Sequence, residues 1–85
     1  MTPTERQVHD AEEHTATAAG MAAAAALREA LARVGITLPS VRGSTPLAGT
    51  AFVELGGTAA GTATRLAEIV HAAADARPDL RTPTP

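Results

Sequence analysis

Residues 36–57 read ITLPSVRGSTPLAGTAFVELGG, and this stretch decides what the rest of the chain can build. Its apolar residues keep no helical period, and four helix breakers interrupt it: Pro39, Gly43, Pro46 and Gly49. A helix is therefore excluded here, and the chain must turn back on itself between two more regular segments.

Two short extended pieces are predicted inside this stretch, roughly at residues 36–41 and 51–55, with a turn-rich loop between them. In the second piece, Phe52 and Glu54 alternate with Val53 and Leu55, so either pair could face inward. We expect Val53 and Leu55 to face the core and Phe52 to cover it from one side.

Upstream of this stretch the residues are good helix formers as far as Val34, interrupted only by Gly20. Thr2-Pro3-Thr4-Glu5 is typical of a helix start, with Thr2 as the N-cap and Pro3 as the first helical residue. One rod of about thirty residues is expected; alternatively the polar first fourteen residues fray and the firm helix begins near Ala16. Gly35 is expected as the left-handed residue that ends the helix, with Ile36 touching Leu31 in a Schellman arrangement.

One face of this first helix combines small and large apolar residues, a seam that lets another backbone approach closely. We predict a partner interface on this face, with Phe52 of the central stretch beside it. Its residues are Gly20, Ala24, Leu27, Leu31, Val34 and Phe52.

Downstream, Gly56-Gly57 leads into a second helix with Thr58 as its expected N-cap and Arg77 as its end, before Pro78. Its apolar stripe is expected at 3–4 spacing, formed by Ala63, Leu66, Ala67, Val70 and Ala74 and widened by Ile69 and Ala73.

The predicted fold is mainly α: a long N-terminal helix, a short extended or two-stranded centre, and a second helix packed on the first (α-β-β-α or α-loop-α). Residues 1–15 form a polar extension that is helical or frayed, 16–77 a single small domain, and 78–85 a disordered tail. The large apolar side chains are few for 85 residues, so a homodimer through the first helix is expected to complete the core.

Composition excludes several kinds of function. The net charge of −2 and the single aromatic residue argue against nucleic-acid binding, and the absence of Cys and Lys removes thiolate sites and phosphate-binding lysines. The longest small-apolar run, residues 18–27, is too short to cross a membrane. A cytoplasmic location is expected, and the Ala-, Gly-, Arg- and Pro-rich composition indicates a GC-rich bacterial genome.

The loop GGTAAGT at residues 56–62 has the G-x-x-x-x-G spacing of a phosphate loop, but Thr62 stands where Lys is needed. A strand-to-helix turn is the expected role, and a weak anion site at Gly57, Thr58 and Gly61 the alternative.

The histidines do not converge on a metal. His9 and His14 are five residues apart, on different sides of a helix, and with Asp10 and Glu13 they form a solvated polar face. His71 and Asp75 form an ordinary surface pair. No catalytic residue, metal ligand or cofactor site is predicted.

The segments LREALARVGITLPS (27–40) and FVELGGTAAGTATRLAEIV (52–70) resemble short uncharacterised proteins of high-GC actinobacteria. Those chains share a G-I-x-L-P-S element after a helix and a V-E-L-G element before an A-x-x-L-A helix. The resemblance brings no function with it. It implies that Gly35, Leu38, Pro39, Leu55 and Gly56 shape the fold and form no site.

The leading functional interpretation is a small non-catalytic interaction or regulatory accessory protein, acting as a homodimer or within a complex. A DNA-associated regulator that uses the helix at 59–76 as its recognition helix is the first alternative, although only Arg65 and Arg77 would reach DNA. A weak anion or nucleotide binder at the GGTAAGT loop is the second.

Overall fold

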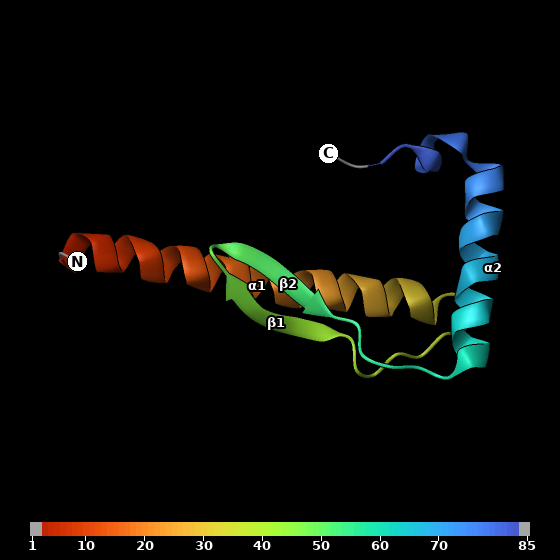
Figure 1. Cartoon of the computed structure of the whole chain (residues 1–85), viewed down its shortest axis with the longest axis horizontal. Coiled ribbons are helices and arrows are strands. Elements are labelled where there is room, and N and C mark those ends of the chain that lie inside the picture. The colour runs from red at the N-terminus through yellow and green to blue at the C-terminus, as the bar shows by residue number, and fades with distance from the viewer. Residues whose placement is uncertain (1–2, 84–85) are drawn as a thin grey trace.

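A computed structural model describes the backbone of residues 3–83 and the side chains of residues 11–83. In chain order the elements are α1 (Pro3–Ala32), β1 (Arg42–Leu47), β2 (Thr50–Glu54), α2 (Ala60–Ala76) and a short 3-10 helix, η1 (Pro78–Arg81). Figure 1 shows the hairpin of β1 and β2 lying along α1, with α2 standing at the far end. The fold is mainly α, as expected, and the two-stranded antiparallel sheet is its second component.

The long helix α1 runs unbroken for 30 residues, about 45 Å at 1.5 Å per residue. Its predicted cap, Thr2, lies outside the described residues. At the other end, Gly35 has a φ of 77°, and the Ile36 and Gly35 amides donate to the Leu31 and Ala32 carbonyls at 2.9 and 3.1 Å. These two bonds form the Schellman motif, so the predicted helix end is confirmed.

The first strand lies further along the chain than predicted. Residues 36–41 form a connection, and the strand that pairs with β2 is Arg42–Leu47, which contains a glycine and a proline. In the register, Gly43 faces Val53 and Ser44 faces Phe52, whereas Leu47 faces Thr50, so β1 carries one extra residue between Ser44 and Leu47. Pro46 lies in this irregularity, where a missing backbone N–H costs no ladder bond.

The hairpin turn consists of two residues, Ala48 and Gly49, which have φ values of 51° and 78°. Positive φ at both central residues is the requirement of a type I′ turn, whose twist matches that of two paired strands. The turn thus closes the ladder at Leu47 and Thr50 with the shortest common loop.

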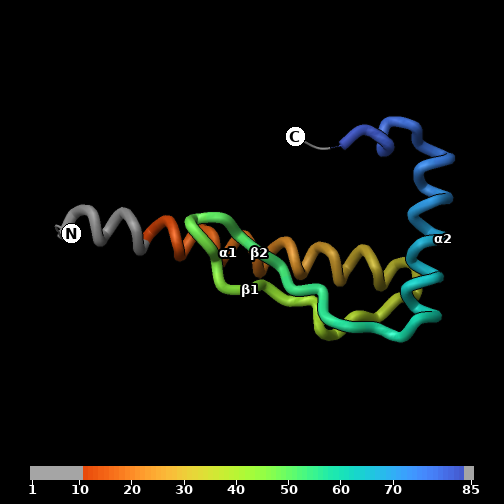
Figure 2. The backbone as a smooth tube through the Cα atoms, in the orientation of Figure 1, coloured from red at the N-terminus to blue at the C-terminus, as the bar shows by residue number. Residues whose placement is uncertain are grey.

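The hairpin approaches α1 backbone to backbone. A Cβ on Gly43 would lie 2.9 Å from the Met21 amide nitrogen, and a Cβ on Gly20 would lie 2.8 Å from the Phe52 carbonyl oxygen. Two glycines therefore meet where the hairpin lies against the helix. Figure 2 shows the course of these backbones. The small-residue seam predicted on α1 does accept another backbone, and that backbone belongs to this chain's own hairpin.

The core that this contact encloses is small. Its buried apolar side chains come from α1, the connection and the start of the sheet: Ala16, Ala24, Leu31, Ile36 and Val41. Arg28 of α1 donates a hydrogen bond to the Val41 carbonyl, and the Ser40 hydroxyl donates to the Leu55 carbonyl at 3.1 Å. Both bonds fix the connection against the helix and against the chain leaving β2.

Val53 is half-buried, in keeping with its expected inward position, whereas Leu55 is 57% exposed just beyond the end of β2. Phe52 is 44% exposed and pairs with Ser44, next to the pair of Gly43 and Val53. The inward placement predicted for Leu55 is therefore wrong, because the strand ends at Glu54 and the chain leaves the core there.

The packing predicted for the second helix is wrong. Among the described elements, α1 contacts β1 and β2, whereas α2 contacts only η1. The hairpin already occupies the face of α1 that α2 was expected to cover, and the extended residues 55–59 carry α2 away from it. Thr58 does not cap α2: the N-cap is Ala59, and it makes no side-chain capping bond.

The C-terminal segment expected to be disordered carries η1, which folds back on the end of α2. Arg81 donates from Nε to the Ala74 carbonyl at 2.9 Å, and the Arg77 guanidinium pairs with Asp79 at 2.7 Å. Only residues 84–85 of that tail lie outside the described residues at this end.

Candidate protein-interaction surface

One side of α2 is apolar, and η1 is the only described helix or strand that α2 contacts. Leu66 and Ile69 are half-buried and Val70 is 58% exposed, and no residue of α2 is fully buried. These three residues recur at helical spacing and so share one side, which we call the apolar face of α2. All three belong to the apolar stripe that the sequence periodicity predicted, but the stripe does not pack on α1 as predicted.

Three of the six residues predicted as a partner interface are buried inside this chain. Gly20, Ala24 and Leu31 lie on the face of α1 that meets the hairpin and the connection. Since the chain covers them itself, they are not available to a partner in this fold. The rest of that set remains accessible: Leu27 is 37% exposed, Phe52 is 44% exposed and Val34 is half-buried.

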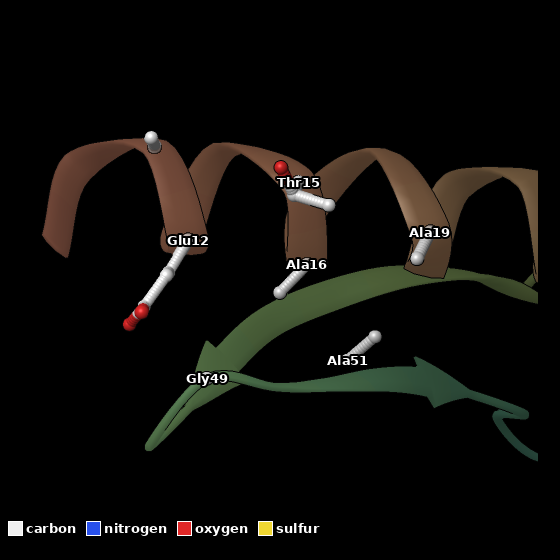
Figure 3. A pocket seen from close by; sticks show the side chains of 7 residues that line it. Glu12, Thr15, Ala16, Ala19, Gly49 and Ala51 are labelled. Atoms are coloured by element: carbon white, nitrogen blue, oxygen red, sulfur yellow. The ribbon is translucent and has the colours of Figure 1, made fainter. Parts of the chain in front are cut away.

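A second surface feature, which the sequence did not indicate, is a groove between the N-terminal half of α1 and the tip of the hairpin. We call it the tip groove; it is open to solvent, has a volume of about 570 Å³ and is lined by Ala11, Glu12, Thr15, Ala16, Ala19, Gly49 and Ala51. Figure 3 shows Ala16, Ala19 and Ala51 turned toward the space between helix and hairpin, with the Glu12 carboxylate at its outer end.

The tip groove exists because its lining residues are small. The hairpin rises away from α1 beyond the Gly20–Gly43 crossing, and alanine methyls on both sides leave the space between them unfilled. A protein interior is close-packed, so an apolar space of this size at a surface is suited to large side chains from another molecule. No pattern in the sequence predicts it, since the groove depends on where the hairpin tip lies relative to α1.

The residues of the alternative anion site are exposed and lie at or before the start of α2. Gly57 and Thr58 belong to the extended connection, Gly61 is the second residue of the helix, and nothing lies within 4 Å of a Cβ placed on either glycine. No described hydrogen bond joins a charged side chain to Gly57, Thr58 or Gly61. Within the described part of the chain, no three His, Asp or Glu side chains cluster closely enough to hold a metal ion. His9 and Asp10 of the predicted polar face have side chains outside the described residues.

The basic residues of the DNA-binding alternative lie apart. Arg65 is exposed on α2, whereas Arg77 is the C-cap of α2 and forms an ion pair with Asp79. Glu68 and Asp75 lie on the same helix, so α2 presents mixed charge to its surroundings.

No protein-family model, curated protein or solved structure matches this chain. None of the described helices combines the length and the apolar character that crossing a membrane requires.

Proposed function

We propose that this chain is a small non-catalytic interaction protein that binds another protein chain through the apolar face of α2. The observation that carries the proposal is the isolation of α2: among the described elements it contacts only η1, although Leu66, Ile69 and Val70 line up on one side. A cytoplasmic setting fits this role, since the chain has no cysteine to form the disulfides common in exported small domains.

Helix physics supports the need for a partner. A helix of 17 residues is marginal by itself in water, and in proteins most helical stability comes from packing an apolar face. Fully burying one Leu, Ile or Val side chain contributes about 1.5–3 kcal/mol. Covering the apolar face would therefore stabilise α2 by several kcal/mol, which its own chain does not supply.

The test is affinity capture with three forms of the full chain: wild type, Val70→Glu and Thr64→Glu. Val70→Glu places a charge on the apolar face, whereas exposed Thr64 lies on the opposite side of the same helix and serves as the matched control. We expect wild type and Thr64→Glu to retain the same bound chain, either another protein or a second copy, and Val70→Glu to lose it.

Equal retention by all three forms would show that α2 does not mediate binding and would overturn the proposal. Circular dichroism of each form checks that Val70→Glu keeps its helices, so that a loss of binding comes from the changed surface; α1 and the hairpin make no contact with α2 that the substitution would break.

A further inference from the structure

The chain exposes far more surface than a compact protein of its mass. Its accessible area is 6555 Å², about 1,900 Å² more than the roughly 4,700 Å² expected for a folded monomer of 8.6 kDa. Its radius of gyration is 16.7 Å, against about 12 Å for a compact domain of this length. A partner that restored a normal exposed area would cover close to 1,900 Å² of each chain.

This excess matches what a second copy would bury. If each of two chains lost about 1,900 Å², the interface would total roughly 3,700 Å², within the range of about 2,000–5,000 Å² for obligate homodimers. The share of each chain, about 1,900 Å², is more than twice the roughly 800 Å² that each partner contributes to a standard-sized interface. One helix face is too small to account for it, so more than one surface of each chain must be covered.

Two open surfaces of the chain differ in the size of the side chains that form them. The apolar face of α2 carries large side chains, and the tip groove is lined mainly by alanine and glycine. They lie apart along a molecule 52 Å long, with α2 at one end and the hairpin tip over the N-terminal half of α1, so α2 does not fill the groove of its own chain in this arrangement (Figure 1). Two chains related by a twofold axis that reverses the direction of α1 would each bring an α2 to the other's groove.

We propose that the chain forms a reciprocal homodimer in which the apolar face of α2 from each copy occupies the tip groove of the other. This inference deepens the proposed function and rests on it, because it names the second copy as the chain that α2 binds. Charge is consistent with the pairing: Glu12 lies at the groove, and Arg65 lies one turn before Ile69 on α2. A contact between the two α2 helices alone would cover one surface per chain and leave the groove open.

The first experiment measures self-association of the full chain by sedimentation equilibrium. Ala19 lines the groove and Ala18 does not, and both are exposed alanines in the middle of α1, so Ala19→Arg and Ala18→Arg form a matched pair. We expect a dimer for wild type and Ala18→Arg. In a homodimer of Ala19→Arg or of Val70→Glu, both contacts between α2 and the groove contain the substitution. We therefore expect the dimer dissociation constant of each variant to rise by at least about 100-fold.

The second experiment mixes the two defective chains. In the reciprocal dimer, the intact α2 of Ala19→Arg still fits the intact groove of Val70→Glu, so the mixture recovers one contact and forms a heterodimer. A dimer built on two α2 helices would show no recovery, because one of its two faces is always charged. Recovery in the mixture therefore supports the reciprocal arrangement, and no recovery overturns it.

Cross-linking gives an independent readout with nearly native chains. The sequence has no cysteine, so Ala19→Cys and Val70→Cys introduce single thiols. A short thiol-to-thiol cross-linker should join the two variants to each other and neither to itself. Cross-linking of Val70→Cys to itself would contradict the proposal, and so would a wild-type chain that stays monomeric. A monomer that still captures another protein through Val70 would leave the proposed function standing.

Discussion

The backbones of α1 and the hairpin approach closely at two residues without side chains. A Cβ on Gly43 would be blocked by the α1 backbone at Met21, and a Cβ on Gly20 by the β2 backbone at Phe52. Elsewhere in a helix, glycine costs about 1 kcal/mol relative to alanine. At Gly20 the contact with the hairpin reverses that preference.

Gly20→Ala should therefore destabilise the protein even though alanine favours the helix. The added methyl would lie 2.8 Å from the Phe52 carbonyl oxygen, and forced overpacking costs about 1–3 kcal/mol, more than the ~1 kcal/mol gained in helix propensity. We expect a net loss of about 1 kcal/mol in the free energy of unfolding, seen as a Tm lower by roughly 4–8 °C.

Gly61→Ala is the matched control, because Gly61 is also helical and nothing lies within 4 Å of its added Cβ. This substitution should leave the Tm unchanged or raise it, since only the helix propensity acts. If both substitutions raised the Tm, the close approach of hairpin and helix would be contradicted.

The hairpin turn offers a second test at single-residue resolution. Ala48 has a φ of 51°, a conformation that costs an alanine about 1–2 kcal/mol and that asparagine adopts more readily. Ala48→Asn creates the Asn-Gly pair favoured in type I′ turns, and we expect it to stabilise the protein by about 0.5–1 kcal/mol in urea unfolding. Ala48→Val should destabilise it, because a β-branched residue is strained at positive φ; the reverse order would argue against this turn.

At the scale of elements, local signals predicted what local geometry decides. The end of α1 was predicted because Gly35 and Ile36 complete a motif with residues only a few positions earlier. The first strand was placed too early because Ile36, Leu38 and Val41 offered apolar residues. The observed strand depends instead on pairing with β2 and on Gly43 meeting Gly20, two contacts between distant parts of the sequence.

The same distinction explains the candidate site. The apolar stripe on α2 could be predicted because its periodicity depends on neighbouring residues only. The surface that packs against the stripe could not be predicted, since the stripe shows that one side of the helix is apolar but not what buries it. The tip groove could not be predicted, because its walls come from the position of the hairpin on α1.

The two parts of the chain should differ in local stability. α1 and the hairpin contact each other extensively, whereas α2 contacts only η1. In the Ala19→Arg variant, which we expect to be monomeric, the amides of α2 should exchange with solvent much faster than those of α1 near Ala24 and Leu31, because local opening is easiest where few contacts are lost. Hydrogen exchange followed by NMR measures this directly, and equal protection of both helices would contradict it.

For the whole molecule, the extended shape links stability to association. The molecule measures 52 × 28 × 18 Å, and only five apolar side chains are buried among the residues whose side chains are described, so it has little core of its own. If a second copy supplies the missing burial, folding and dimerisation are coupled, and the Tm must depend on protein concentration.

We expect the wild-type Tm to rise with each tenfold increase in concentration and the Val70→Glu Tm to stay constant. Differential scanning calorimetry over a concentration series measures both. A wild-type Tm that does not change with concentration would show that the chain reaches its stability alone, in spite of its large exposed area.

The two-stranded sheet leaves each strand with one edge that pairs with no other strand of the described chain. On β1, the extra residue near Pro46 interrupts that edge, which hinders the addition of a further strand. β2 carries no proline or glycine, and its sequence TAFVE includes a partly exposed phenylalanine. Disordered aggregation of this protein would therefore begin at the edge of β2, and an ordered dimer that forms quickly would protect the chain from it.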